Sequence, residues 1–230
     1  MKTLRAHASI LLLSTLAAGC ATRGQTPATP APTTATAADE HRHTDNPASA
    51  PAVHDMHAMH DMHGMSAPIV IPKGALYTEA DVHFMQGMIA HHAQAIHMSR
   101  LAATRGADPR LLRFALKIDQ SQWAEIRLMQ DWLHANGQMA PDTSSWRTMS
   151  MPGMLTADEL AQLDAARGTA FDRLFLTLMI RHHEGALLMV SELLATPRAA
   201  QDVDVNVFAN DVEAVQTAEI AVMRQMLTDR

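Results

Sequence analysis

DVHFMQGMIAHHAQAIHM, residues 81–98, and DRLFLTLMIRHHEGALLM, residues 172–189, are two copies of one helical pattern. The copies share Asp, Phe, Met, Ile, a His-His pair, Ala and Met at matching places. At 100° per residue the shared positions fall within an arc of roughly 120°, the width of a buried stripe on a helix. Each copy therefore predicts a helix that turns two histidines toward a core.

A second repeat follows each of these segments. Gln-x-x-Glu-Ile-x-x-Met begins at Gln122 in QSQWAEIRLM and again at Gln216 in EAVQTAEIAVM. Cap and stop signals divide the chain into four long helices and one short helix, and nothing indicates a strand. The expected helices are 78–105, 109–136, a short one opened by Thr156-x-x-Glu159, 169–196 and 201–228. We predict an all-α domain over 77–230, a ferritin-like four-helix bundle made of two duplicated helical hairpins.

The N-terminus indicates export. Lys2 and Arg5 precede a short apolar run that ends in LAAGC, where Cys20 is the only cysteine. This stretch resembles a bacterial lipoprotein signal, which implies a signal peptide over 1–19 and lipid attachment at Cys20; ordinary signal cleavage nearby is the alternative. Ala21 after the cysteine resembles sorted lipoproteins and implies an outer-membrane anchor facing the periplasm. The formal charge of −6 and the absence of a basic block exclude a nucleic-acid partner.

Residues 20–76 are predicted to form a disordered tether, because they are rich in Thr, Ala and Pro and have few apolar anchors. Within this tether, HDMHAMHDMHGM (54–65) places a histidine at every third position and a methionine two places after each. Histidine can bind Cu(II) and methionine Cu(I), so the stretch is a candidate copper-binding tail, with a polar linker of biased composition as the alternative. Its candidate ligands are His54, Met56, His57, Met59, His60, Met62, His63 and Met65.

The paired histidines of the bundle are the second candidate site. Four imidazoles in a helical core must be hydrogen-bonded or bound to metal. The candidate ligands are His91, His92, His182, His183, Met88, Met179, Met98 and Met189, with Asp81, Asp172, Gln122 and Gln216 as supporting residues or caps. The structural alternative is that these four supporting residues simply satisfy the histidines. A di-iron site is disfavoured because no Glu-x-x-His occurs; imidazole and thioether favour copper, chiefly Cu(I), and then Ag(I).

These motifs also resemble a known family. The two F-x-x-x-M-I-x-H-H segments, MPGM at 151–154 and the two Gln-x-x-Glu-Ile-x-x-Met segments are similar to those of a ferritin-like bacterial family catalogued as a domain of unknown function. The resemblance covers about residues 77–228. It implies a four-helix bundle and periplasmic copper binding linked to copper resistance.

Three functions are consistent with the sequence. The first is a non-enzymatic metal-binding protein of the cell envelope, which sequesters copper or hands it to an efflux component. The second is a metal-dependent oxidase that uses the central site, and the third is a structural or stress lipoprotein without metal. No hydrolase, transferase or phosphate-binding motif occurs. Because imidazole must be neutral to bind metal, copper affinity is expected to fall as the pH drops through about 6.

Overall fold

The computed structural model describes residues 68–229, and every regular element in this range is a helix. The prediction of an all-α fold with four long helices and one short helix is confirmed. The elements are α1 (Glu79–Leu101), α2 (Pro109–Ala135), a 3₁₀ turn (Ser145–Arg147), α3 (Ala157–Ala165), α4 (Gly168–Ala195) and α5 (Val203–Thr228). The predicted signal peptide, Cys20 and the tail at 54–65 lie outside the described residues.

Local sequence explains where these helices begin and end. Asp108 caps α2, because its Oδ1 accepts a hydrogen bond from the backbone N of Arg110 at 2.7 Å, with Pro109 at the first helical position. The first helix stops earlier than predicted, at Leu101. The backbone N atoms of Ala102 and Thr104 bond three residues back, so the chain tightens into turns before Gly106.

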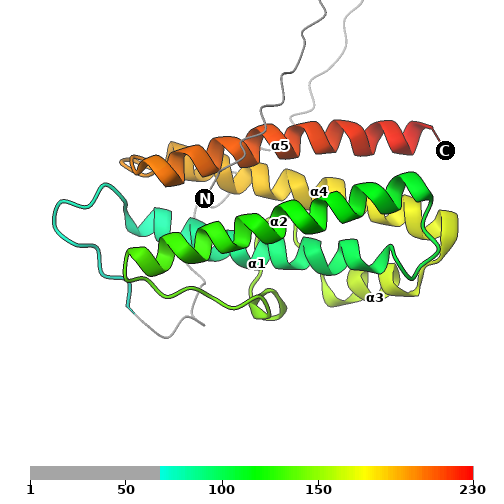
Figure 1. Cartoon of the computed structure of the whole chain (residues 1–230), viewed down its shortest axis with the longest axis horizontal. Coiled ribbons are helices and arrows are strands. Elements are labelled where there is room, and N and C mark those ends of the chain that lie inside the picture. Colours follow the sequence, from blue (N-terminus) through cyan, green and yellow to red (C-terminus); the bar gives the residue numbers. More distant parts are fainter. Residues whose placement is uncertain (1–67, 230) are drawn as a thin grey trace, which may run out of the picture. The chain divides into compact units, whose positions relative to one another are not determined.

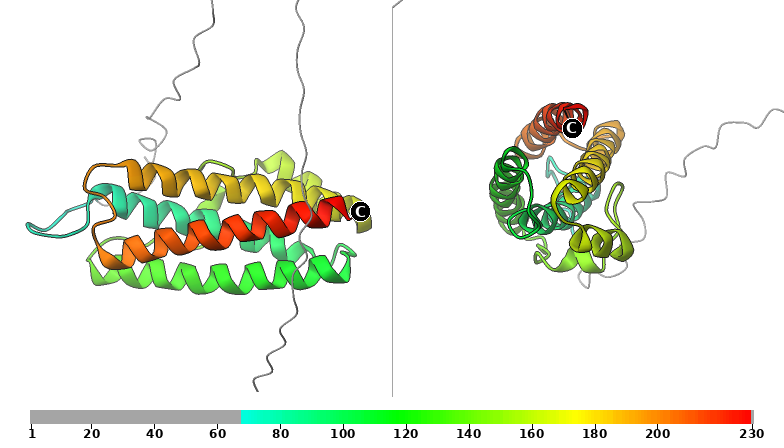
Figure 2. Two further views of the ribbon diagram at one scale, coloured as in Figure 1. Left: turned by 90° about the horizontal axis from the view of Figure 1, so that it is seen from above. Right: turned by 90° about the vertical axis from the view of Figure 1, so that its right-hand side faces the viewer.

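The four long helices lie side by side as two hairpins, with α3 along one flank (Figures 1 and 2). The closest packing joins α1 to α2 and α4 to α5, and α1 also packs against α4. The helices α2 and α5 are not among the closely packed pairs. None of the described helices has the length and apolar character needed to span a membrane.

The core consists of two apolar clusters, one toward each end of the bundle. The first includes Phe84 and Phe208, and the second includes Phe171 and Phe175. On each long helix the two clusters are separated by buried polar positions. The split arises because the repeated sequence pattern replaces apolar residues by His and Gln halfway along each stripe. The polar layer between the clusters is the candidate functional site.

Candidate metal centre in the bundle core

Six buried polar side chains form the layer between the two clusters. His91 and His92 of α1 and His182 and His183 of α4 are fully buried, and Gln122 of α2 and Gln216 of α5 are each only 2% exposed. The sequence predicted that the duplicated pairs would meet in the interior, and the structure brings them together there.

His91 and His182 are the closest pair in this layer. Their ring centroids are 3.8 Å apart and their planes are inclined by 40°. His91 Nε2 donates a hydrogen bond to the carbonyl oxygen of Pro152 at 3.1 Å. Neither ring nitrogen of His182 has a partner among the described residues. Two imidazoles from different helices thus face each other at the bundle axis, and one of them has no hydrogen bond.

The second histidine of each pair is held by a glutamate from the partner helix of its own hairpin. His92 Nε2 lies 2.6 Å from Glu125 Oε2 of α2, and His183 Nε2 lies 3.0 Å from Glu219 Oε2 of α5. Sequence reasoning missed both glutamates as histidine partners. The signal was present, because each is the Glu of the repeated Gln-x-x-Glu-Ile segment.

These contacts assign the tautomers of three histidines. Carboxylate and carbonyl oxygens only accept hydrogen bonds, so the Nε2 atoms of His91, His92 and His183 carry the proton. In a neutral imidazole the other nitrogen, Nδ1, then has a free lone pair. All three Nδ1 atoms are buried without a hydrogen-bond partner. A carboxylate that holds the far side of a histidine is also the usual support for a metal-binding imidazole.

Burial keeps the central imidazoles in this neutral form. Burial, reinforced by the nearby His92, lowers the pKa of His91 to about 3. Burial and then His91 hold the pKa of His182 well below its ordinary value. Burial raises the pKa of Glu219, but the hydrogen bond from His183 and the charge of Lys117 outweigh it, so the net pKa is lowered. The layer therefore combines neutral imidazoles, the form of histidine that is able to bind metal, with an ionised carboxylate.

The four candidate thioethers flank this layer on both sides. Met88 and Met189 belong to the cluster around Phe84, whereas Met98 and Met179 belong to the cluster around Phe171. All four are buried. The arrangement places soft sulfur ligands above and below the histidines.

The predicted supporting residues divide into two groups. Asp81 Oδ2 accepts from the backbone N of Thr78 and its Oδ1 accepts from the backbone N of Ala200, both at 2.6 Å. Asp172 Oδ1 accepts from the backbone N of Asp108 at 3.1 Å. The aspartates thus fix helix starts, which agrees with the predicted alternative of a capping role. The histidines are instead held by Glu125 and Glu219, which the sequence analysis did not predict. Gln122 and Gln216 do lie in the layer, with unpartnered Oε1 atoms.

The loop carrying MPGM covers the side of the layer, not the end of the bundle. Gly153 adopts φ +78°, and a Cβ there would lie 2.6 Å from the carbonyl oxygen of Arg181. A Cβ on Gly185 of α4 would collide with the carbonyl group of Pro152. These two glycines let the loop backbone approach α4, which brings the Pro152 carbonyl to His91.

The described residues contain no preformed metal site built from His, Cys, Asp and Glu side chains alone. Within residues 68–229, no group of three or more His, Cys, Asp or Glu side chains is arranged to hold a metal ion. The donor set of the layer, two facing imidazoles flanked by methionines, fits a soft ion with few ligands better than a hard ion that prefers oxygen.

Known proteins of similar sequence share this helical fold. The family model described as "Domain of unknown function (DUF305)" matches residues 81–227. A DUF305 fragment from Deinococcus radiodurans is 31% identical, with a TM-score of 0.58, over 67% of this chain and 99% of that one. A DUF305 protein from Streptomyces coelicolor, described as secreted, is 29% identical, with a TM-score of 0.57, over 65% of this chain and 93% of that one.

The copper-binding relative has a similar fold. CopM in its Cu(I)-bound form is 28% identical, with a TM-score of 0.52, over 65% of this chain and 96% of that one. CopM has also been solved with Cu(II) and with silver. No curated protein matches the chain.

Proposed function

Because the chain belongs to the DUF305 family, whose solved members include copper-bound CopM, we propose that it is a copper-binding protein of the bacterial cell envelope. It would bind Cu(I) above all, and also Cu(II) and Ag(I), to sequester copper or to pass it to an efflux component. A single observation carries the proposal: the free Nδ1 lone pairs of buried histidines whose opposite nitrogens are held by fixed acceptors.

In this function the protein binds copper without acting as a metal-dependent oxidase. His91 and His182 are fully buried, so the layer offers no open position to which a substrate could bind next to a metal. Ligands enclosed in this way favour retention of an ion. Turnover of Cu(I) or Fe(II) under oxygen by the metal-loaded protein would instead support the oxidase.

Location at the envelope is part of the same proposal. The export signal at 1–19 and the secreted relative from Streptomyces coelicolor both support a position outside the cytoplasm. We propose that Cys20 is lipidated and anchors the chain to the outer membrane. Mass spectrometry of the mature protein should find a lipid-modified N-terminal Cys20; an unmodified N-terminus downstream would contradict the anchor.

The central site is tested in a chain whose residues 54–65 are replaced by a Gly/Ser stretch of equal length. Cu(I) affinity is measured by competition with a chelator for the parent and for the His91→Ala/His182→Ala variant. We expect the variant to lose high-affinity copper binding, because both facing imidazoles are gone. The matched control is His83→Ala/His134→Ala, which removes two histidines outside the layer and should bind like the parent.

Undiminished copper binding by His91→Ala/His182→Ala would reject the central site. Circular dichroism at the same concentration checks that the variant keeps its helices. Glu125→Gln serves as a milder second variant, since it leaves every imidazole in place. Loss of a carboxylate support costs a metal site about 10–100-fold in affinity, so this variant should weaken binding without abolishing it.

A further inference from the structure

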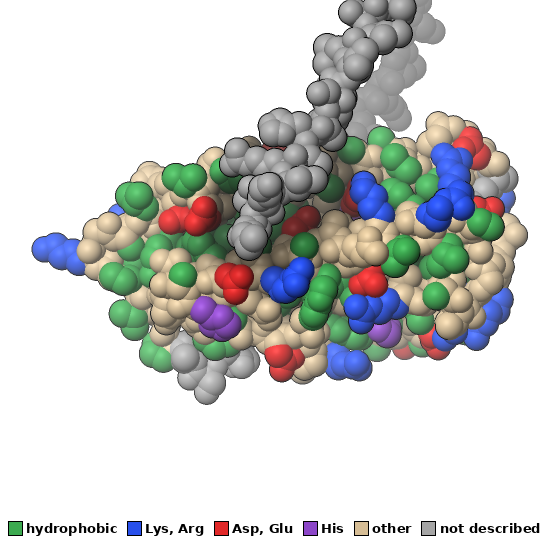
Figure 3. Space-filling view, in the orientation of Figure 1, with side chains coloured by type: hydrophobic (Ala, Val, Ile, Leu, Met, Phe, Trp, Pro, Cys, Tyr) green, Lys and Arg blue, Asp and Glu red, His purple; other side chains and the backbone are tan. Residues whose placement is uncertain are grey.

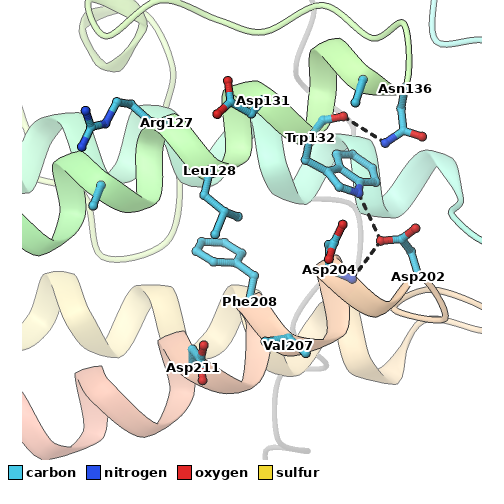
Figure 4. A pocket seen from close by; sticks show the side chains of 12 residues that line it. Arg127, Leu128, Asp131, Trp132, Asn136, Asp202, Asp204, Val207, Phe208 and Asp211 are labelled. Atoms are coloured by element: carbon cyan, nitrogen blue, oxygen red, sulfur yellow. Dashed lines mark hydrogen bonds between the residues drawn. The ribbon is translucent and has the colours of Figure 1, made fainter. Parts of the chain in front are cut away.

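A groove of about 830 Å³ runs between α2 and α5, the two helices that do not pack closely together. Leu128 of α2 and Phe208 of α5 face each other across it (Figure 4). Leu128 and Val207 also line it and are 46% and 53% exposed. Figure 3 views this side of the molecule, where apolar, acidic and basic side chains are mixed on the surface that the grey atoms leave visible.

The groove is lined by four aspartates and one arginine, for a formal charge of −3. Asp202 has a structural role, because it caps α5 and its Oδ1 accepts a hydrogen bond from Trp132 Nε1 at 3.1 Å (Figure 4). The side chains of the other three, Asp131, Asp204 and Asp211, make no hydrogen bond or ion pair within residues 68–229. The groove thus holds three uncompensated carboxylates beside exposed apolar surface.

The N-terminal part of the chain joins the bundle at one end of this groove. The carbonyl oxygen of Val70 accepts a hydrogen bond from Gln138 Nε2 at 2.9 Å, and the same Nε2 lies 3.3 Å from the carbonyl oxygen of Asn136. Asn136 lines the groove. The His/Met segment at 54–65 ends only five residues before Val70.

The lengths are compatible with this placement. The groove extends along α2 from Asn136 to Ala124, about 18 Å at 1.5 Å per residue. Twelve residues in extended form span about 40 Å, and the five that connect them to Val70 span about 17 Å. The segment can therefore reach the whole groove, and so short a connection gives it an effective concentration near the millimolar range.

The chemistry of the segment matches the groove when the segment carries metal. Residues 54–65 contain four histidines and two aspartates, so the metal-free segment has a formal charge of −2 with neutral imidazoles and is repelled by the groove. One Cu(II) ion brings the segment to zero and a second makes it positive. Its four methionines suit the exposed apolar side chains of the groove, Leu128 and Val207.

We propose that the α2/α5 groove is the docking site for residues 54–65 in their Cu(II)-loaded form. This inference rests on the proposed copper binding and adds a structural consequence to it. Binding of Cu(II) to residues 54–65 would favour their docking in the groove, and loss of the ion would disfavour it through charge repulsion. The bundle then has a role distinct from its own histidine layer.

The test uses the chain from residue 20 with Cys20→Ser, so that no thiol competes for copper. Trp123→Phe and Trp146→Phe leave Trp132, in the groove, as the only tryptophan. Cu(II) is added and the quenching of Trp132 fluorescence is recorded, while equilibrium dialysis gives the copper bound per chain. Bound Cu(II) quenches only nearby rings, so quenching reports docking and dialysis reports binding.

The groove variant is Asp131→Asn/Asp204→Asn/Asp211→Asn, which spares the structural Asp202. Losing three exposed charge interactions of ordinary strength should weaken docking about tenfold, so quenching falls at equal copper content. The control Glu79→Gln/Asp158→Asn/Glu213→Gln removes three exposed carboxylates elsewhere and should quench like the parent. Replacing the four tail histidines by serine should also remove the quenching.

Unchanged quenching in the groove variant, or quenching that survives the loss of the tail histidines, would overturn the docking while leaving copper binding intact. A chain that takes up no copper in dialysis would overturn the proposed function and, with it, the docking. Fluorescence quenching therefore tests the docking, and dialysis tests the proposed copper binding.

Discussion

Glu125 and Glu219 hold equivalent histidines in the two halves of the bundle, but only Glu219 is paired with a lysine. Lys117 Nζ lies 3.4 Å from Glu219 Oε1, and the Glu219 side chain is 4% exposed. The Glu125 side chain is 27% exposed and has no cation beside it among the described residues. In the repeat, the position of Lys117 is taken by Asp211 on α5. The pseudo-symmetric layer thus has a buried, lysine-paired glutamate on one side and a partly exposed glutamate on the other.

The two glutamates should therefore differ in their contribution to stability. Glu219→Gln removes a buried carboxylate that His183 and Lys117 both bind, and we expect a loss of about 2–3 kcal/mol in the free energy of unfolding. Glu125→Gln should lose about 1 kcal/mol or less, since solvent reaches this side chain. Urea denaturation of the metal-free protein measures both. Equal losses would contradict the asymmetry.

The approach of the MPGM loop to α4 depends on Gly185. In Gly185→Ala the new methyl group collides with the Pro152 carbonyl, so the loop must move off the helix and off His91. We expect a loss of about 2–4 kcal/mol in the free energy of unfolding, as for other overpacked sites.

Gly87 on α1 provides the matched control for this substitution. A Cβ there would lie 3.4 Å from the terminal methyl of Met189, a flexible group that can shift. Gly87→Ala should be neutral or slightly stabilising, because alanine favours the helix. If both substitutions lower the melting temperature equally, the close approach of the Pro152 backbone to residue 185 is not the cause of the destabilisation.

Sequence reasoning reached the histidine layer because the information was local and duplicated. The spacing of His91 and His92 within one stripe, copied at His182 and His183, defines a face without any knowledge of the neighbouring helices. The glutamates were missed because the pairing of His92 with Glu125 depends on the register of α1 against α2. A single helix pattern does not set that register. The α2/α5 groove was not predictable from one helix pattern either, because it depends on how far apart two helices lie in the bundle.

The buried histidines should make the metal-free bundle sensitive to acid. The folded-state pKa of His91 is about 3, whereas an unfolded histidine titrates near 6.5, so the unfolded state binds the extra proton between these values. The lowered pKa of His182 acts in the same direction. These histidines therefore do not destabilise the fold above about pH 6.5, and they destabilise it increasingly as the pH falls toward 3.

A histidine of this kind costs at most about 1.36 kcal/mol per pH unit, so His91 alone should cost about 2 kcal/mol at pH 5 relative to neutral or higher pH, and His182 adds to this loss in the same direction. Urea denaturation at these pH values measures the slope. In His91→Gln/His182→Gln the slope should largely disappear, while His97→Asn, which removes a half-buried histidine of lowered pKa outside the layer, should keep most of it. A slope that persists in the double variant would assign the acid sensitivity to other groups.

Copper held in the layer should survive acid that would release it from an ordinary histidine site. The sequence-based expectation of a fall near pH 6 assumes an imidazole that protonates at its usual pKa, whereas burial lowers the pKa of His91 to about 3. With residues 54–65 replaced by Gly/Ser, the Cu(II)-loaded bundle should therefore keep its copper after dialysis at pH 5. A peptide of residues 54–65, whose Cu(II) ligands are histidines with ordinary pKa values, should lose its copper under the same conditions. Release of copper from both near pH 6 would show that the bundle-bound ion is held by solvent-exposed histidines and not by the buried layer.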